Sequence, residues 1–171
     1  MDVETRTTSA AAVVAALLLV AAVGCTAGTG SIPSGRVELS DLRTAYGCGY
    51  GFQAGDAVGT VGIFLEHASP GEPPPVAPVD LGDGDAAWSG EIRLGRGLFN
   101  NWCNDILAEP EATVDQTWEL VDGVVAITEV DESAGTATLR ATDLVAVDLA
   151  GTRHALGDIT LVNDAWGVFA G

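Results

Sequence analysis

Two histidines are the natural candidates for a catalytic base in this sequence, because histidine titrates closer to neutral pH than any other side chain. They are His67 and His154. A serine hydrolase would combine one of them with a serine and a carboxylate, and Asp158 or Asp164 could supply the carboxylate. No serine lies in the G-x-S-x-G pattern that exposes the nucleophile of many hydrolases. We therefore predict no catalytic residue and keep a small hydrolase as an alternative.

A cluster of carboxylates is the second feature that could do chemistry, because oxygen ligands suit divalent cations such as Ca²⁺. The cluster consists of Asp80, Asp83, Asp85 and Glu91. An EF-hand loop that started at Asp83 would need an oxygen ligand at its fifth position and glycine at its sixth, where Ala87 and Trp88 stand. The segment is therefore either a looser calcium loop or a solvated acidic turn. Calcium is the one cofactor that the sequence suggests.

Tryptophans at positions 88, 102, 118 and 166 offer aromatic surface. Aromatic rings present a large apolar face, and such platforms on β domains can hold sugars. The first three fall on apolar stripes or at strand ends, and we expect them in the core. Trp166, in the segment NDAWG, is the one that we expect to be exposed. It is the candidate ligand-binding residue, with a glycan as the ligand.

Cys48 and Cys103 are the two cysteines outside the first 25 residues. An even number of cysteines in an exported protein indicates a disulfide. Closing so long a loop stabilises a fold by about 4 kcal/mol in the chain-entropy estimate. That is comparable with the net stability of a typical domain. We therefore predict a Cys48–Cys103 disulfide.

The remaining cysteine, Cys25, ends an apolar stretch. Residues 10–23 carry no charge, which suits a signal-peptide core and is too short for a membrane-spanning helix. The stretch closes with Ala22-Val23-Gly24-Cys25, which resembles the lipobox of bacterial lipoproteins, with alanine where leucine is commoner. The resemblance implies that residues 1–24 are removed and that Cys25 is acylated. The protein would then be held on the extracytoplasmic face of the cell membrane.

Residues 26–35 are small, uncharged and rich in glycine, serine and threonine. Such a composition is typical of a flexible tether. We therefore divide the chain into a signal peptide at 1–24, a tether at 25–35 and one domain at 36–171. The length of the last part suits a single hydrophobic core.

The charge of the chain limits its partners. It contains 24 acidic residues against 7 arginines and lysines, with a formal net charge of −17. Nucleic acids and anionic surfaces attract cationic patches, so we predict no nucleic-acid partner. The sequence contains no lysine, and together with abundant alanine, glycine, valine and aspartate this resembles proteins of high-GC actinobacteria. An envelope protein or a glycan remains as the partner class.

Period-two alternation dominates the domain and predicts strands. We expect residues 42–54 to form one strand, with Tyr46, Cys48 and Phe52 on a single apolar face. Asp122-Gly123 predicts a two-residue hairpin turn. We also expect breaks near Asp143 and at residues 157–158, and a last short strand at residues 166–169.

Residues 97–106 instead show an apolar stripe with helical spacing and predict one short helix that carries Cys103. The fold class expected is therefore all-β. It is an antiparallel β-sandwich or barrel with one short helix and a disulfide staple.

The segments GCGYGF, NWC and NDAWG also resemble small actinobacterial lipoproteins. That resemblance implies no activity and no site residues. The function that we expect is a non-catalytic, membrane-anchored binding or interaction module of the cell envelope. The alternatives are a calcium-binding domain and, behind it, a small hydrolase.

Overall fold

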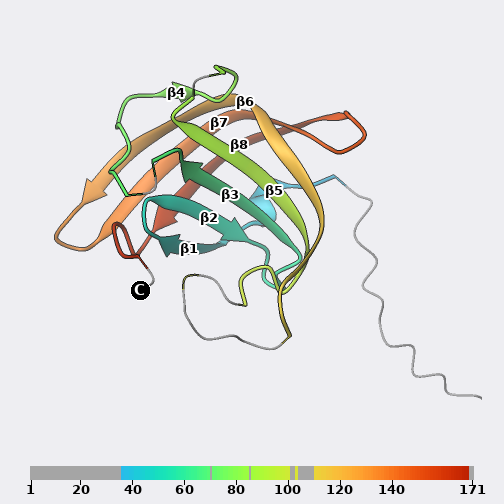
Figure 1. Cartoon of the computed structure of the whole chain (residues 1–171), viewed down its shortest axis with the longest axis horizontal. Helices are drawn as coiled ribbons and strands as arrows, with labels where there is room; N and C mark the ends of the chain where they lie inside the picture. Colours follow the sequence, from blue (N-terminus) through green and yellow to red (C-terminus); the bar gives the residue numbers. More distant parts are fainter. Residues whose placement is uncertain (1–35, 70, 85, 101–102, 104–109, 170–171) are drawn as a thin grey trace, which may run out of the picture. The chain divides into compact units, whose positions relative to one another are not determined.

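The structure is a computed structural model that describes residues 36–69, 71–84, 86–100, 103 and 110–169. Cys25, Asp85, Trp102 and the tether lie outside the described residues. Figure 1 shows the elements of the described part in chain order. They are the 3-10 helix η1 (Leu39–Asp41) and the strands β1 (Thr44–Cys48), β2 (Gly51–Gly55), β3 (Val61–His67), β4 (Val79–Asp80), β5 (Trp88–Arg96), β6 (Thr113–Asp131), β7 (Thr136–Val147) and β8 (Arg153–Asn163).

The strands form one antiparallel sheet in the order β1-β2-β3-β5-β6-β7-β8. The two-residue strand β4 pairs with the second half of β6, where Val79 lies opposite Val125. The sheet curls so that β1 and β2 contact β8, which gives a half-barrel (Figure 1). The antiparallel, barrel-like class predicted from the sequence is confirmed. No helix in the described part of the chain has the length and apolar character needed to cross a membrane.

The concave face of the curled sheet holds the core. Phe52, Ile63 and Ile92 have no exposed surface, and Leu139 and Ala141 continue the same layer on β7. Residues between these positions point to the opposite face of the sheet, because successive side chains of a strand alternate. Removing this much apolar surface from water is the main force that holds the sheet in its curled form.

The single strand predicted over residues 42–54 is wrong, since this segment is the β1–β2 hairpin. The chain turns at Gly49 and Tyr50, where Gly49 has a φ of 58°. Because of this two-residue turn, even-numbered side chains point to one face of the sheet in β1 and to the other face in β2. Cys48 therefore lies on the face opposite the core, while Phe52 lies on the core face. The glycine supplies the left-handed backbone that this reversal needs.

Asp122-Gly123 is not a hairpin turn either, because β6 runs through it without interruption. Gly123 has a φ of 121° and sits in a β-bulge, where the register against β7 shifts. Its carbonyl accepts a hydrogen bond from the Leu81 N–H at 2.8 Å. The bulge bends β6 so that its first half pairs with β5 and its second half with β4.

The predicted breaks in the last two long strands are bulges as well. Asp143 has a φ of 54° and Gly157 one of 87°, and β7 and β8 continue past them. The Asp143 N–H donates to Asp158 Oδ1 at 3.0 Å, so the two irregularities support each other. Residues 166–169 form no strand. Trp166 makes an isolated bridge with Gly49, whose N–H donates to the Val168 carbonyl at 2.6 Å.

The Cys48–Cys103 disulfide is confirmed, with the two Cα atoms 5.6 Å apart. Of the helix predicted over residues 97–106, residues 98–100 and Cys103 have turn conformation, and the remainder lies mainly outside the described residues. Phe99 packs on a floor of Gly55 and Gly62, where an added Cβ would come within 3.0 Å of its ring. These two glycines let an aromatic ring rest on bare backbone.

The open side of the curl is closed by Asn163, the last residue of β8. Its Nδ2 donates to the carbonyls of Gly49 at 3.1 Å and Gly51 at 2.7 Å, and its Oδ1 accepts from the Ala165 N–H at 2.8 Å. Gly47 lies so close that an added Cβ would be 2.3 Å from this Oδ1. One side chain with no exposed surface thus joins the two edges of the sheet.

Candidate functional site

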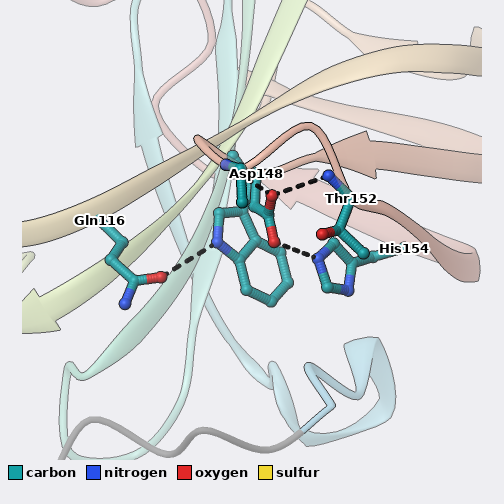
Figure 2. Close-up of polar contacts among 6 residues, drawn as sticks. Gln116, Asp148, Thr152 and His154 are labelled. Atoms are coloured by element: carbon teal, nitrogen blue, oxygen red, sulfur yellow. Dashed lines mark hydrogen bonds and ion pairs between the residues drawn. The ribbon is translucent and has the colours of Figure 1, made fainter.

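The structure brings His154 next to a carboxylate, and among the described residues no hydroxyl or thiol is hydrogen-bonded to its ring. His154 Nε2 is 2.9 Å from Asp148 Oδ2. Its ring stacks on the indole of Trp118, with the ring centroids 4.2 Å apart and the planes 9° from parallel. Gln116 Oε1 accepts a hydrogen bond from Trp118 Nε1 at 3.3 Å. Figure 2 shows His154 and Thr152 converging on Asp148.

Asp148 closes the turn between β7 and β8. Its Oδ1 accepts the N–H groups of Ala150 and Thr152, both at 2.9 Å. The hydrogen bond from His154 and then that from the Thr152 N–H hold the pKa of Asp148 below its ordinary value, because they stabilise the carboxylate. This arrangement fixes the turn and ties it to β6. It holds the imidazole of His154 between the Asp148 carboxylate and the indole of Trp118.

The hydrolase alternative finds no triad among the described residues. The Nδ1 atom of His67 lies 3.0 Å from the carbonyl oxygen of Ser69, and no hydroxyl or thiol in the described part of the chain is hydrogen-bonded to either imidazole. Asp158 instead accepts from the Asp143 N–H and lies near Arg140. Nucleophilic catalysis needs nucleophile and base within hydrogen-bond reach, and this geometry does not provide that.

A groove of about 800 Å³ lies over β3, β5 and β6. The loop after β4 and the β7–β8 turn form its sides. Its carboxylates come from five separate parts of the chain, and they are Glu66, Asp83, Glu91, Glu119 and Asp148. Phe64, Leu120 and Leu149 also line it, and of these three Leu149 is exposed while the other two are buried. Ligand sites typically occupy about 300–1,000 Å³ and combine apolar lining with a few polar groups.

The groove is electrostatically unbalanced. Glu91 forms an ion pair with Arg93, whose guanidinium lies 4.2 Å from the centre of the Phe64 ring. Asp148 is paired with His154. The other three groove carboxylates have no ion-pair partner among the described residues, and they are Glu66, Asp83 and Glu119.

One pair of carboxylates in the groove destabilises the folded sheet. Glu91 on β5 and Glu119 on β6 are directly opposite each other in the sheet. Like charges at such positions destabilise a sheet by about 0.2–1 kcal/mol. Arg93 relieves the repulsion only from the Glu91 side. A cation bound in the groove would remove the remainder, so this pair indicates the kind of ligand that the groove suits.

The residues predicted to bind calcium are only partly brought together. Asp83 and Glu91 line the groove, and Asp85 lies outside the described residues. Asp80 is not part of the lining, and its Oδ1 accepts the Gly82 N–H at 2.8 Å. Within the described ranges, no three His, Cys, Asp or Glu side chains are placed to hold a metal ion together. Calcium binding therefore stays a prediction.

Trp166, the predicted glycan-binding residue, is partly buried and packs against the core. Its ring meets Tyr50 edge-on at 4.9 Å and lies 5.4 Å from Phe52. Phe169, which also contacts Tyr50 edge-on, is 49% exposed. An aromatic cluster does exist at this end of the sheet, and Trp166 forms its base while Phe169 forms its surface.

Sequence reasoning missed the groove and Asn163. Alternation within β5 and β6 could place Glu91 and Glu119 on a non-core face, but only the register shows that they are neighbours. No signal in the sequence distinguishes Asn163 from an ordinary turn asparagine. Gln53, 1% exposed and with no hydrogen-bond partner for its Oε1, also carries no signal of its burial.

No known protein family, curated protein or solved structure matches this chain.

Proposed function

We propose that this protein is a lipid-anchored, extracytoplasmic binding module that holds a cationic ligand in the acidic groove. The observation that carries the proposal is the groove itself. Five carboxylates converge on about 800 Å³ of space, and three of them have no ion-pair partner in the described part of the chain. The anchor at Cys25 is inferred from the lipobox resemblance and the tether that follows it.

The composition of the groove favours a basic peptide segment, such as one presented by another envelope protein. Leu149, which is exposed, would contact the apolar stem of a lysine or arginine side chain, whose charged head reaches the surrounding carboxylates. A surface with one sign of charge also raises the rate at which opposite charges arrive, and salt weakens the effect. Binding without catalysis fits the absence of a triad among the described residues.

Calorimetric titration of the mature chain with a short peptide of alternating lysine and leucine tests the proposal. We expect binding that weakens as salt is added, and no binding of a matched peptide of alternating glutamate and leucine. Replacing two groove carboxylates, Asp83→Asn with Glu119→Gln, should weaken binding about tenfold. Glu132→Gln is the matched control, because Glu132 lies in the exposed turn between β6 and β7, outside the groove. Equal binding of both peptides, or of neither, contradicts the proposal.

The anchor has its own test. Mass spectrometry of the intact protein from bacterial membranes should show a lipid adduct at an N-terminal Cys25, and Cys25→Ala should release the protein from the membrane fraction. A chain that keeps residues 1–24, or that carries no acyl group, would refute the anchor. That result would leave the groove proposal untouched.

Calcium is the second candidate, favoured by Asp83 and Glu91 in the same groove. Millimolar calcium should raise the melting temperature of the protein if the groove holds this ion, and EDTA should reverse the rise. An unchanged melting temperature would leave the peptide as the ligand.

A further inference from the structure

His154 and the acidic groove share one carboxylate, that of Asp148. Asp148 lines the groove, and its Oδ2 is 2.9 Å from His154 Nε2 (Figure 2). Both side chains are partly exposed, so a proton from solvent reaches the imidazole without unfolding of the domain. Histidine is the side chain whose charge ordinarily changes between about pH 5 and 8. A group that changes its charge in this range therefore lies directly beside the groove.

The hydrogen bonds at Asp148 determine which imidazole nitrogen takes up the proton. The bond from His154 is the first of the causes that hold the pKa of Asp148 below its ordinary value, so the carboxylate stays ionised where histidine titrates. Because an ionised carboxylate only accepts hydrogen bonds, Nε2 of the neutral ring carries the hydrogen and donates it. No hydrogen bond reaches Nδ1 of His154 from any described residue. Nδ1 is therefore the basic atom of the ring.

The strands around His154 bring one carboxylate to its ring. Asp148 forms the ion pair with the imidazole, and β6 contributes the uncharged indole of Trp118. Arg153, the preceding residue on β8, points to the other face of the sheet because successive side chains alternate, and it is paired with Asp122. A proton on His154 is therefore balanced by Asp148.

The segment before β1 also faces His154. Arg36 is the charged residue of this segment beside the imidazole, and it forms an ion pair with Glu38. Asp41 of η1, which packs against β8, lines a different hollow. The hollow next to the imidazole measures about 240 Å³, and it is lined by Arg36, Val37, His154, Ala155 and Leu156. It leaves space for water beside the ring.

Uptake of a proton at Nδ1 changes the charge of the groove wall. The pair of His154 and Asp148 then carries no net charge, where it carried one negative charge before. Glu66, Asp83 and Glu119 remain as the groove carboxylates without an ion-pair partner in the described ranges. A cation in the groove is attracted by fewer negative charges, so acid weakens its binding.

We propose that His154 is the proton sensor of the acidic groove, and that protonation of its imidazole weakens the binding of the cationic ligand. This inference rests on the proposed function, because it concerns the regulation of the same groove. His154 acts through Asp148 and is a positioning residue, since its ring does not line the groove. The ligand is held at neutral pH and released as the surroundings become acidic.

The coupling must act in both directions. If a proton on His154 weakens the binding of a cation by some factor, a bound cation makes protonation of His154 harder by the same factor. Coupling between two sites is typically fivefold or more, and we expect about fivefold here because both side chains are partly exposed. This reciprocity allows two independent measurements.

The first measurement is calorimetric titration of the mature chain at pH 7.5 and 5.5. The probe is the peptide of alternating lysine and leucine with an acetylated N-terminus, so that its own charge does not change. Binding should be about fivefold weaker at pH 5.5. His154→Gln keeps an N–H donor for Asp148 but cannot be protonated, and it should bind equally at both pH values.

The other histidine of the chain supplies the matched control. The Nδ1 atom of His67 lies 3.0 Å from the Ser69 carbonyl oxygen, and His67 has no ion pair with a carboxylate among the described residues. His67→Gln should therefore keep the fivefold difference between the two pH values. A difference that survives His154→Gln, or that disappears in His67→Gln, overturns the proposal.

The second measurement follows the protonation of His154 itself by NMR of the imidazole carbon-bound protons. The probe is hexaamminecobalt(III), a trivalent cation whose N–H groups donate to carboxylates and whose charge is constant in this pH range. With the cation present, half-protonation of His154 should need a proton concentration about fivefold higher. The groove variant Asp83→Asn with Glu119→Gln should lose this effect, and Glu132→Gln should keep it. No effect of the cation, or an equal effect in the groove variant, overturns the proposal.

The two measurements distinguish failure of the sensor from failure of the proposed function. If the peptide binds equally well to the unmodified chain at both pH values, the proposed function stands and the sensor is overturned. If the peptide binds at neither pH, the proposed function fails, and the effect of hexaamminecobalt(III) on His154 still decides whether the imidazole senses a cation in the groove.

Discussion

Two polar contacts help to hold the curled sheet, one between strands far apart in the sequence and one within the β7–β8 hairpin. They differ in almost every physical respect. The amide contact is made by Asn163, which has no exposed surface and donates to the carbonyls of Gly49 and Gly51. The imidazole contact is made by His154 and Asp148, whose side chains are 29% and 21% exposed. The amide contact is uncharged and buried, whereas the imidazole contact contains ionisable groups and is partly exposed to solvent.

This difference indicates which contact stabilises the fold and which one responds to pH and salt. A buried amide that loses its partners leaves them unsatisfied in the core, and the penalty is large at every pH. A partly exposed ion pair contributes little, is screened by salt and changes with protonation. We expect the amide contact to keep the half-barrel closed and the imidazole contact to tune the turn beside the groove.

The largest effect is expected for Asn163→Ala. The substitution removes the amide donor from the carbonyls of Gly49 and Gly51 and the acceptor from the Ala165 N–H, although the Gly49 carbonyl keeps its hydrogen bond from the Gly167 N–H. The loss should lower the free energy of unfolding by about 3 kcal/mol. Urea unfolding at pH 7 measures this value. Asp164→Ala, the exposed neighbour, is the control and should change little. Equal values for the two variants would show that the amide contact does not close the sheet.

Gly47→Ala attacks the same contact from the other strand. Its Cβ would lie 2.3 Å from Asn163 Oδ1 and 2.6 Å from the Ala165 nitrogen, so the C-terminal segment must move. We expect a loss of about 2 kcal/mol. Combined with Asn163→Ala, the total loss should fall short of the sum, because both changes break one contact. Gly71→Ala, where no atom lies within 4 Å of an added Cβ, is the control.

Asp148→Asn should change the pH dependence of stability more than stability itself. The folded protein holds the pKa of Asp148 below the ordinary value of 3.8. The carboxylate therefore stabilises the fold above that value, and the contribution is lost as the pH falls through the folded pKa. Unfolding at pH 7, 5 and 3 should show a shallower loss on acidification in the variant.

Asp131→Asn gives the matched comparison for this prediction. Asp131 also has a lowered pKa, chiefly because the Ser133 hydroxyl donates to it, but it contacts no histidine. Both variants should therefore lose acid sensitivity. Only Asp148→Asn should change the fluorescence of Trp118, which stacks on His154. Identical spectra would mean that the imidazole contact does not depend on the carboxylate.

The smallest effect is expected for Glu119→Gln, and its sign is opposite. Removing the charge facing Glu91 should raise the free energy of unfolding by about 0.5 kcal/mol. The same variant should bind the basic peptide more weakly, a trade between stability and function. Glu129→Gln, elsewhere on β6 and opposite Thr138, should change neither quantity. A destabilised Glu119→Gln would show that this glutamate is not under repulsion.

The sequence predicts the class of this fold well and its interruptions poorly. Period-two alternation identifies the strands, and the pair Cys48 and Cys103 identifies the disulfide. Glycine is an ambiguous signal in the sequence, because it forms part of a turn at Gly49 and part of a β-bulge at Gly123. A local pattern cannot separate these outcomes, since each depends on which strand approaches from outside the segment. At Gly123 the deciding partner is Leu81 of another loop.

The site was less predictable than the fold for the same reason. The sequence predicts Asp83 and Glu91 as site residues because they lie close together in the chain, and both do line the groove. Glu66, Glu119 and Asp148 come from other strands and turns, and only the pairing of β3, β5, β6 and β7 brings them together. The density of carboxylates along the sequence therefore predicts two residues of the groove lining but not the shape of the groove.

The position of Asn163 has a consequence for how the chain reaches its final state. Asn163 lies 114 residues after Gly49, so the amide contact is the most distant in sequence of the hydrogen bonds described above. Neighbouring hairpins of the meander can form as soon as their own residues are available, whereas closing so long a loop is entropically slow. We expect a chain emerging from its N-terminus to assemble an open ribbon of strands first. The ribbon rolls up only when its last strand has arrived, so truncation after residue 162 should stall folding at the open ribbon.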